Sequence, residues 1–358
     1  MTKKLTFLGI ETSCDETAAS IVQENDDGTA NILSSVVSSQ IKEHEKFGGV
    51  VPELAARSHV ENIDFIINRA IKDSNFKLEM IDGVAATAGP GLVVCLSIGF
   101  NIGKSIAGFN RKPFIAVNHL EGHALSAGLE KKIEFPYLLL LISGGHSQFL
   151  IVNGVNDYKQ LGTTIDDAVG EAFDKTAKIL GLSYPGGPAL EKFANDGKKD
   201  FFKLPQPIIN KGGCNLSFAG LKTAVLRESK KLNGKLDLKK NLAASFQSTI
   251  NNILTKKTLV AMKQFKDFSK KKKSNFVIAG GVAANKTIRK NLEKIAIENG
   301  FDPMFPNPKF CGDNAAMIAW AGIKRFKLNL IDDLNFKVKS RWALDAKAPF
   351  MKGPGIKL

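Results

Sequence analysis

Residues 5–22 read LTFLGIETSCDETAASIV, and this stretch decides the fold. Leu5–Ile10 is apolar and rich in β-forming residues, the next six residues are polar, and Thr17–Val22 is apolar again. Two short apolar runs around a polar turn are typical of a β-hairpin. We therefore expect the chain to open with strand, turn and strand, and to continue with a third strand at Ile32–Ser39.

A helix and a strand–glycine–helix unit follow this hairpin. Pro52 can occupy the first turn of a helix that runs to about Ile71, since the apolar residues between them have helical spacing. Gly83–Thr87 has the composition of a buried strand, and the segment Ala88-Gly-Pro-Gly-Leu92 leads from it into an apolar helix that ends at about Ala107. The predicted order is hairpin, helix, strand, helix.

The same order recurs in the second half of the chain. No repeat of individual residues accompanies it, so the similarity is one of pattern. The repeated pattern predicts two related α/β lobes with a cleft between them. Glycine turns at the carboxyl ends of the strands would point into this cleft, where open α/β sheets bind ligands. The segments are the strands Tyr137–Ile142, Gln148–Val152 and Asn275–Ala279, and the helices at about Asp167–Leu180 and Asn285–Gly300.

The net charge of the 358-residue chain is +15, and it comes from one span. Lys222–Lys290 contains 16 Lys and 2 Arg but only 2 Asp and 1 Glu, whereas the rest of the chain is balanced. This disfavours a uniformly basic protein that coats nucleic acid, and an acidic partner that meets one face fits better. The alternative is an ordinary lysine-rich helix surface, and charge reversal of Lys270–Lys273 would separate the two interpretations.

Composition further limits the class of protein. Apolar residues make up 44% of the chain and charged residues 24%, as in ordinary globular proteins. No run approaches the ~18 apolar residues of a membrane helix. The start resembles neither a signal nor a transit peptide, and the four cysteines form no C-x-x-C pair. We expect a cytoplasmic protein of about two domains, with no disulfide framework and no membrane partner.

The segment His119-Leu-Glu-Gly-His123 is the sharpest signal for a metal site. On a helix these imidazoles lie about 40° apart around the axis and can face one ion. Asp313 is the best candidate for a third ligand, because it precedes an apolar helix at Ala315–Ala321. Two histidines and a carboxylate leave positions open, which suits a catalytic Fe²⁺ or Zn²⁺. The alternative is that both histidines cap or pack a helix.

A zinc peptidase is a rival interpretation of the histidine pair. Its helix motif is H-E-x-x-H, with the glutamate next to the first histidine. Here Glu121 follows His119 by two positions, about 200° around a helix, so it could not reach a metal-bound water. The spacing argues against peptidase chemistry.

Glycine-containing loops indicate a phosphate or nucleotide ligand, since glycine lets backbone N–H groups approach an anion. Neither a P-loop nor a G-x-G-x-x-G motif is present. Glu171 and Asp174 lie on one predicted helix face, where they could organise a ligand or be plain solvated acids. No spacing pairs a nucleophile with a base. The loops are Ala88–Gly91, Ser143–His146, Tyr184–Pro188 and Ala279–Asn285.

Eight motifs occur in the order typical of one protein family. With them the chain resembles the bacterial tRNA N6-adenosine threonylcarbamoyltransferases, formerly described as O-sialoglycoprotein endopeptidases. The resemblance spans nearly the whole chain and departs from the family pattern only slightly, at Ser147 and Ala283. The motifs are GIETSCDET at 9–17, HLEGH at 119–123, SGGH at 143–146, GEAFDK at 170–175, YPGGP at 184–188, SFAGLK at 217–222, GGVAAN at 280–285 and CGDN at 311–314.

The resemblance implies an actin-like ATPase fold, that of sugar kinases and heat-shock ATPases. It implies a first lobe at residues 1–125 with a C-terminal helical return at about 313–358. The second lobe then covers 126–312, with a lysine-rich helical insert at about 222–273. The implied reaction moves a threonylcarbamoyl group from threonylcarbamoyl-AMP to N6 of the adenosine 3′ of the anticodon, in tRNAs that read codons beginning with A. AMP leaves, and no covalent enzyme intermediate is expected.

The resemblance also assigns roles to residues. His119, His123 and Asp313 match the ligands of one divalent metal ion, for which Fe²⁺ is favoured over Zn²⁺. Glu11 matches a catalytic acid near the donor phosphate. Nine positions match the residues that bind the adenylate donor: Leu141, Ile142, Ser143, Gly144, Gly145, Asp174, Gly187, Glu191 and Asn285.

The implied partners are tRNA, the threonylcarbamoyl-AMP donor, an inactive paralogue that pairs with the first lobe, and a P-loop ATPase. Two other functions stay open beside the transferase. One is a nucleotide-binding scaffold in a tRNA-modification complex, because this fold supports many roles. The other is a metallopeptidase, which the position of Glu121 opposes.

Overall fold

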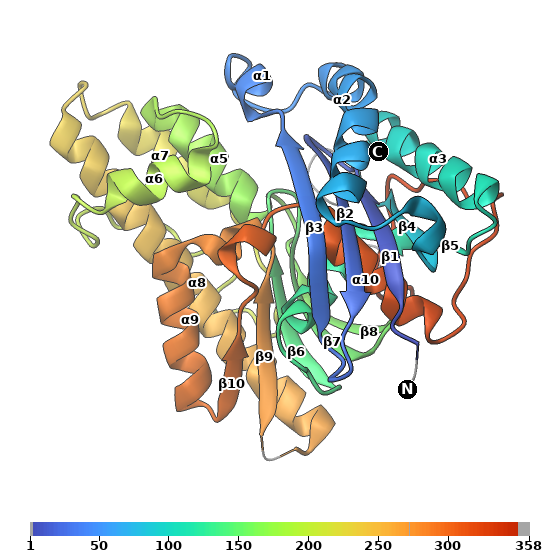
Figure 1. Ribbon diagram of the computed structural model, residues 1–358. Coiled ribbons are helices and arrows are strands. Elements are labelled where there is room, and N and C mark those ends of the chain that lie inside the picture. The colour runs from blue at the N-terminus through green and yellow to red at the C-terminus, as the bar shows by residue number, and fades with distance from the viewer. Residues whose placement is uncertain (1–2, 272, 350–358) are drawn as a thin grey trace. The chain divides into compact units, whose positions relative to one another are not determined.

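The computed structural model describes residues 3–271 and 273–349 (Figure 1). Contacts divide them into two compact units, each built around one five-stranded sheet. Unit 1 contains residues 3–134, 154–157 and 306–346, and unit 2 contains the remaining described residues. Unit 1 therefore extends beyond the lobe predicted at 1–125, and it includes the tip of a hairpin at 154–157 because Asn156 contacts Arg325 of that unit.

The sheet of unit 1 begins with the predicted hairpin. β1 (Thr6–Glu11) pairs antiparallel with β2 (Glu16–Glu24), and β2 pairs antiparallel with β3 (Ala30–Ser39). On its other side β1 pairs parallel with β4 (Gly83–Gly89), which pairs parallel with β5 (Phe114–Asn118). The strand order is β3-β2-β1-β4-β5. All strands predicted in this half are confirmed, and β5 is an additional one.

The sheet of unit 2 has the same topology. β6 (Tyr137–Ile142) pairs antiparallel with β7 (Ser147–Gly154) and parallel with β9 (Ser274–Ala279), which pairs parallel with β10 (Phe301–Met304). With β8 (Asp157–Thr163) at the other edge, the order is β8-β7-β6-β9-β10. Each sheet thus places its first strand in the centre, the next two on one side and the last two on the other. The predicted similarity of pattern is a similarity of topology.

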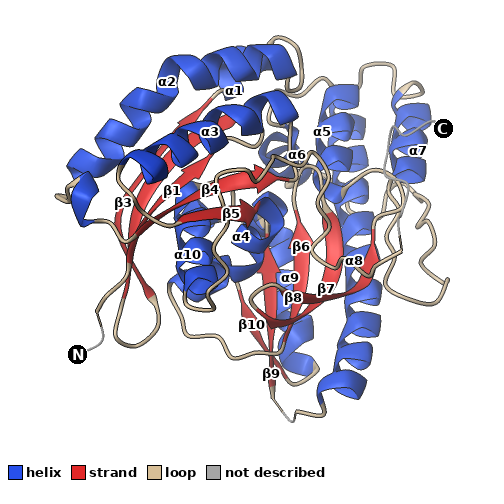
Figure 2. Ribbon diagram, turned by 90° about the vertical axis from the view of Figure 1, so that its right-hand side faces the viewer, coloured by secondary structure: helices blue, strands red, loops and turns tan. Residues whose placement is uncertain are grey.

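Helices cover both faces of the unit 1 sheet. Alternate side chains of β1 divide between two cores: Leu8 and Ile10 contact α2 (Pro52–Asp73) and α3 (Val93–Phe109). Phe7 contacts α10 (Ala315–Phe326), which lies on the opposite face together with α4 (His119–Leu125). Figure 2 shows these two helical layers on either side of the strands. The short helix α1 (Ile41–Glu45) precedes α2.

Unit 2 contains the helices that follow β8. They are α5 (Val169–Leu180), α6 (Gly186–Ala194), α7 (Ala219–Ser229), α8 (Leu236–Ser269) and α9 (Lys286–Glu298). α8 buries one face, on which Leu242, Phe246 and Ile250 are fully buried. The ring of Phe246 packs edge-on against Phe173 of α5, at 5.2 Å between centroids.

Two features differ from the sequence-based expectations. The predicted helical return at about 313–358 is helical only in α10, and residues 327–349 contain no helix; residues 350–358 lie outside the described part of the chain. Three short strands were missed. β5 has only five residues, β8 carries charged residues, and β10 includes Pro303, so none shows a clear strand pattern. Among the described residues, no helix combines the length and apolar character needed to cross a membrane.

Candidate metal centre and donor-binding residues

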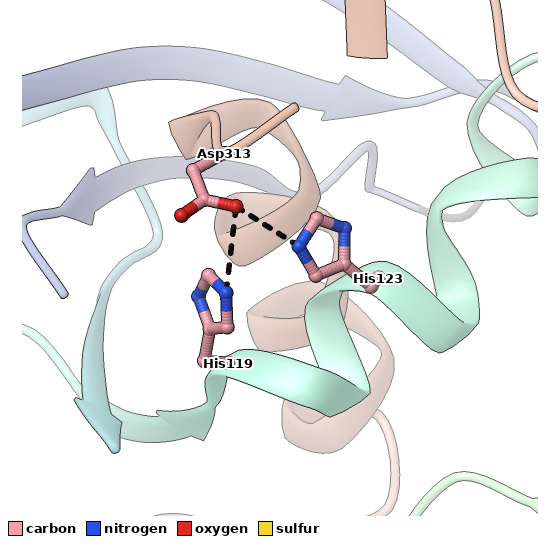
Figure 3. Close-up of side chains that lie close together, drawn as sticks. All are labelled: His119, His123 and Asp313. Atoms are coloured by element: carbon pink, nitrogen blue, oxygen red, sulfur yellow. Dashed lines mark hydrogen bonds and ion pairs between the residues drawn. The ribbon is translucent and has the colours of Figure 1, made fainter. Parts of the chain in front are cut away.

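The three predicted metal ligands lie together in unit 1. Oδ1 of Asp313 is 3.1 Å from Nε2 of His123 and 3.5 Å from Nε2 of His119. One ligand atom from each residue lies within 4.8 Å of the other two, and both imidazoles face the carboxylate (Figure 3). The histidines are buried and the aspartate is partly exposed, so the group opens on the side of Asp313.

Local sequence positions His119 and Asp313 at the starts of two helices, and His123 one turn after His119. Asn118 is the last residue of β5. Its side chain caps α4 by accepting a hydrogen bond from the N–H of Leu120, at 2.9 Å. α4 then presents His119 and His123 on one face, as predicted. Asn314 caps α10 in the same way, accepting from the N–H of Met317 at 3.0 Å, and this fixes the adjacent Asp313.

Close packing brings these two helix starts together. α4 contacts α10 at Gly122, where a Cβ atom would lie 2.9 Å from the Ile318 side chain. β1 contacts α10 at Gly9, where a Cβ atom would lie 2.2 Å from the backbone oxygen of Ala315. A side chain at Gly9 would push α10 away, because it would overlap the backbone of that helix, whereas at Gly122 the Ile318 side chain would have to move. The ligand geometry therefore depends on Gly9, which touches no ligand.

Glu11 lies behind His119 rather than in the open part of the site. One of its oxygens is 3.2 Å from Nδ1 of His119, the ring nitrogen that points away from Asp313. The Thr87 hydroxyl donates to this same oxygen, and the other oxygen accepts from the N–H of Ser13 at 2.6 Å. Glu11 is fully buried. A carboxylate that holds the second nitrogen of a metal-binding histidine fixes the ring orientation and raises its basicity.

The electrostatics of the group suit a cation. Burial lowers the pKa of His119, but the charges of Asp313 and Glu11 outweigh burial and hold this pKa well above its usual value. Burial raises the pKa of Asp313, but His119 and His123 lower it well below its usual value. Burial and the charges of Asp313 and Asp15 raise the pKa of Glu16. Several carboxylates thus share one buried region, and a bound cation would relieve their repulsion.

The donor set fits a divalent transition metal. Imidazole nitrogen with carboxylate oxygen is the ligand chemistry of Fe²⁺ and Zn²⁺ sites. Ligand atoms about 2.1 Å from such an ion are about 3.0–3.4 Å apart, close to the two measured separations from Asp313. His119, His123 and Asp313 are therefore able to hold one ion with open coordination positions.

Glu121 points away from the group, as its spacing predicted. It forms a buried ion pair with Arg325 of α10, at 2.8 Å, and its other oxygen accepts from the N–H of Asn156 at 2.8 Å. The carboxylate that a peptidase would need beside its metal-bound water is thus engaged elsewhere. Cys14 offers no nucleophile either, because burial and the charge of Asp15 raise the pKa of its thiol.

The predicted donor residues form a second group, in unit 2. Leu141 and Ile142 are buried in β6, and the turn that follows contains Ser143, Gly144 and Gly145. The carbonyl of Ser143 accepts from the N–H of Gly170 in α5, at 3.2 Å. A Cβ atom at Gly144 or Gly145 would meet nothing within 4 Å, and neither has a positive φ. Neither packing nor backbone conformation requires these glycines, which leaves space beside the backbone.

The remaining residues that are predicted to bind the adenylate lie in or beside the first turns of two helices. Asp174 of α5 accepts from the N–H groups of Gly186 and Gly187, at 2.9 and 3.3 Å, in the first turn of α6. Glu191 of α6 accepts from the N–H groups of Lys286 and Thr287, at 2.7 and 3.3 Å, in the first turn of α9. These carboxylates occupy N–H groups at both helix starts and tie α6 to α5 and α9 to α6.

Asn285 caps α9 by accepting from the N–H of Ile288, at 2.9 Å, and its amide donates to Gln247 of α8, at 3.2 Å. Sequence reasoning missed Gln247, because it belongs to the helical stripe of α8 and no motif marks it. It also missed Ser13, whose hydroxyl is 3.2 Å from Nδ1 of His119. Only the motif around Cys14 could have drawn attention to that serine.

Comparison with solved structures identifies the fold. HypF from T. kodakarensis matches 91% of this chain and 48% of its own, at a TM-score of 0.58 and 13% identity. Full-length HypF in a phosphate- and nucleotide-bound form matches 92% of this chain and 47% of its own, at a TM-score of 0.56 and 14% identity. HypF has a fold of the actin-like ATPase group, which confirms the predicted fold class.

Comparison of sequences identifies the family. Residues 31–320 match the family model described as tRNA N6-adenosine threonylcarbamoyltransferase. A protein of that name from Pelagibacter ubique is 58% identical over 358 residues, which is the full length of both chains. One from Brucella canis is 51% identical over 350 residues, covering 97% of this chain and 98% of the relative. The chain described here therefore belongs to the tRNA N6-adenosine threonylcarbamoyltransferase family.

Proposed function

We propose that this chain catalyses transfer of a threonylcarbamoyl group from threonylcarbamoyl-AMP to N6 of an adenosine in tRNA, the reaction of its family. One observation carries the proposal: Nε2 of His119 and Nε2 of His123 converge on one carboxylate oxygen of Asp313. Within a family of tRNA transferases, this set of metal-ligating atoms supports a metal-assisted transfer. We favour Fe²⁺ over Zn²⁺ as the ion, because two histidines and one carboxylate with open positions are typical of non-haem iron.

The chain's own residues account for the rest of the chemistry. The donor is a mixed anhydride and is already activated, so the reaction needs no enzyme nucleophile, in agreement with the raised pKa of the Cys14 thiol. A divalent ion held by His119, His123 and Asp313 supplies Lewis acidity toward the donor's carbonyl or phosphate oxygen. Because the adenine amine is a weak nucleophile, we expect positioning to contribute much of the rate.

Glu11 acts through His119 in this proposal. It is fully buried and its oxygens are occupied by His119, Ser13 and Thr87, so the geometry favours a positioning role over the predicted direct role near the donor phosphate. By holding Nδ1 of His119, it fixes which ring nitrogen is presented beside Asp313.

The nine residues in unit 2 are proposed to bind the adenylate. The open space beside Gly144 and Gly145 supports approach of a phosphate to the backbone N–H groups of that turn. As AMP departs, such N–H groups stabilise the charge on its phosphate. Asp174, Glu191 and Asn285 lie beside the starts of α6 and α9, and they are proposed to contact the rest of the nucleotide.

Further details of the reaction belong to the same proposal. The acceptor is the adenosine 3′ of the anticodon in tRNAs that read codons beginning with A. The partners are an inactive paralogue and a P-loop ATPase, and the location is the cytoplasm. The competing function is a nucleotide-binding scaffold whose catalysis belongs to those partners.

The test uses Asp313→Asn, which keeps the shape of the side chain and removes its charge. Asp302→Asn, at an exposed position of β10, is the matched control. Purified full chain, synthetic donor and tRNA are combined with and without partner subunits, and modified nucleosides are measured by mass spectrometry. Asp313→Asn is expected to retain its circular dichroism spectrum and to lose both metal and transfer, because a neutral amide is a poor third ligand.

Full modification by a metal-free Asp313→Asn protein would exclude metal-assisted transfer. If the unmodified chain transfers only with its partners, and a metal-free Asp313→Asn protein then transfers equally well, the scaffold function is favoured instead. Transfer by the chain alone excludes a pure scaffold.

A further inference from the structure

We propose that unit 2 carries an RNA-binding surface that holds the anticodon stem-loop of tRNA through phosphate contacts and stacking on one exposed aromatic ring. This inference rests on the proposed function, which makes tRNA the substrate. The surface, called here the Phe201 surface, lies on the end of α6, the segment that follows it, and the first turn of α9. It consists of Lys192, Lys198, Lys199, Phe201, Lys203 and Lys286.

The lysines of this surface are available to phosphates. All are exposed, and none forms an ion pair with any residue in the described part of the chain. Asp196 pairs with Lys240 at 3.0 Å. Asp200 accepts from the Ser248 hydroxyl at 3.5 Å and keeps its charge, but Lys192, Lys198, Lys199 and Lys203 outnumber it. The segment therefore presents net positive charge, which binds the phosphate backbone independently of sequence.

Phe201 supplies the second component of single-stranded RNA recognition. Its side chain is 51% exposed, between lysines on both sides in the sequence. Its ring lies 5.0 Å from the ring of Phe202, tilted by 60°, and the N–H of Phe202 donates to the Ser245 hydroxyl at 3.1 Å. An exposed ring held among cations is the arrangement on which unpaired bases stack.

The segment is fixed on α8. The N–H of Lys198 donates to the side chain of Asn241 at 2.8 Å. At Gly197 the two backbones approach so closely that a Cβ atom would lie 2.1 Å from the carbonyl oxygen of Lys240. These contacts order the backbone beneath Lys198 and Phe201 before RNA binds, which reduces the entropy lost on binding.

The same part of α8 also contacts the predicted donor residues. Gln247 accepts from the amide of Asn285 at 3.2 Å and donates to the hydroxyl of Thr287 at 3.2 Å. The next residue, Ser248, is the one that donates to Asp200. Glu191 binds the backbone of Lys286. The Phe201 surface thus borders the residues assigned to the adenylate, where the acceptor adenosine of the tRNA has to arrive.

The lysine run at 270–273, which sequence composition suggested, lies at the other end of α8. Ser269 ends this helix 22 residues after Gln247, or about 33 Å along it at 1.5 Å per residue. Lys263, Lys271 and Lys273 are exposed there and offer a matched control with the same number of charges. Proximity to Asn285 favours the Phe201 surface over this run.

The test measures binding of an anticodon stem-loop RNA to the full chain by fluorescence anisotropy at 50 and 200 mM salt. The variants are K198A/K199A/K203A, the single change Phe201→Leu, and the control K263A/K271A/K273A. AMP affinity and thermal unfolding are followed for each protein, so that damage to the donor residues or to the fold is seen separately. Phe201→Leu keeps an apolar side chain against Phe202 and removes only the stacking face.

We expect the K198A/K199A/K203A protein to lose about two units of salt slope, at roughly 0.7 per phosphate contact. When salt is raised from 50 to 200 mM, the fold-loss of RNA affinity should then be roughly 15 times smaller in this variant than in the unmodified chain. Phe201→Leu should bind about tenfold more weakly with an unchanged slope, because stacking does not depend on salt. The control should match the unmodified chain, and AMP affinity should be constant throughout.

An unchanged affinity and slope in K198A/K199A/K203A would overturn the proposal, as would an equal loss in the control. Failure of the proposed function looks different, because the unmodified chain would then bind RNA through the Phe201 surface without transferring the threonylcarbamoyl group.

Discussion

His119 shows how one side chain is controlled by residues far apart in the chain. Nε2 faces Asp313 and Nδ1 faces Glu11, at 3.5 and 3.2 Å. The spacing to His123 is readable in the sequence, because it depends only on helix geometry. The contact with Glu11 joins residues 108 positions apart, and no local pattern reveals it.

Metal binding should therefore depend on pH. The pKa of His119 lies well above its usual value, so the metal-free protein holds a proton there that the ion has to displace. From about pH 6 up to that raised pKa, metal affinity should increase up to tenfold per pH unit and then level off. Metal titrations at pH 6, 7 and 8 measure this.

The variant Glu11→Gln provides the control. Removing that charge lowers the pKa of His119, so the plateau should be reached at lower pH. Equal metal affinity at pH 6 and pH 8 in the unmodified protein would contradict the assignment. The free energy of unfolding of the metal-free protein should fall over the pH range in which metal affinity rises. The contribution of charged His119 is full below about pH 6.5 and is lost as pH rises through the raised folded pKa.

Glu121 belongs to the structure of unit 1 rather than to its chemistry. Glu121→Gln would leave Arg325 buried without its charged partner, and we expect a loss of about 3 kcal/mol in the free energy of unfolding. Metal content should be unchanged. Denaturant unfolding and elemental analysis measure the two quantities, and Glu53→Gln, in an exposed pair with Arg57, should have no measurable effect. Loss of metal in Glu121→Gln would show that this acid belongs to the site.

At the scale of elements, helix starts and glycine turns carry most of the proposed site. α4, α6, α9 and α10 each begin beside an assigned residue, and Asn118, Asn285 and Asn314 cap three of them. The starts of α9 and α10 were predictable, because caps and apolar periodicity are local, whereas no helix was predicted at α6. Strands β8 and β10 were missed because their pairing within a sheet, rather than their own composition, makes them strands. β5 is apolar but has only five residues.

Two glycines that border the same turn should respond differently to alanine. At Gly144 a Cβ atom meets nothing, so Gly144→Ala should change the free energy of unfolding by less than about 0.5 kcal/mol and weaken AMP binding. At Gly170 a Cβ atom would lie 2.6 Å from the carbonyl oxygen of Ser143, and Gly170→Ala should cost about 1–3 kcal/mol. Denaturant unfolding and calorimetric titration with AMP distinguish them. Tight AMP binding by Gly144→Ala would exclude this turn as a phosphate site.

For the whole molecule, the metal group joins segments that are distant in the chain. His123 and Asp313 are separated by 190 residues, yet both belong to unit 1, because the chain returns to that unit at residue 306. A bound ion therefore links the start of α4 to the start of α10 and stabilises only the folded state.

Removal of the metal should lower the thermal unfolding temperature of the full chain. At a free metal concentration of 100 times Kd, the stabilisation is about 2.7 kcal/mol, and a chelator should abolish it. His123→Ala should unfold at the same temperature with and without chelator. Thermal scans of both proteins, with elemental analysis, check this. A chelator effect of equal size in His123→Ala would place the stabilising ion elsewhere.

The sequence by itself determined the hairpin and central strands of each half, the recurrence of one pattern in both halves, the family, and the pairing of His119 with His123, because periodicity, caps and motifs are local in the chain. Only the tertiary structure decided that Glu11 holds His119, that Glu121 pairs with Arg325, and that Gln247 and Ser248 connect Asn285 with the segment around Phe201. It also decided that α8 ends at Ser269, beside the lysine run at 270–273, whereas the connection from the segment around Phe201 to Asn285 runs through Gln247 and Ser248. These facts depend on which distant segments pack together, and that is set by burial and backbone pairing across the fold.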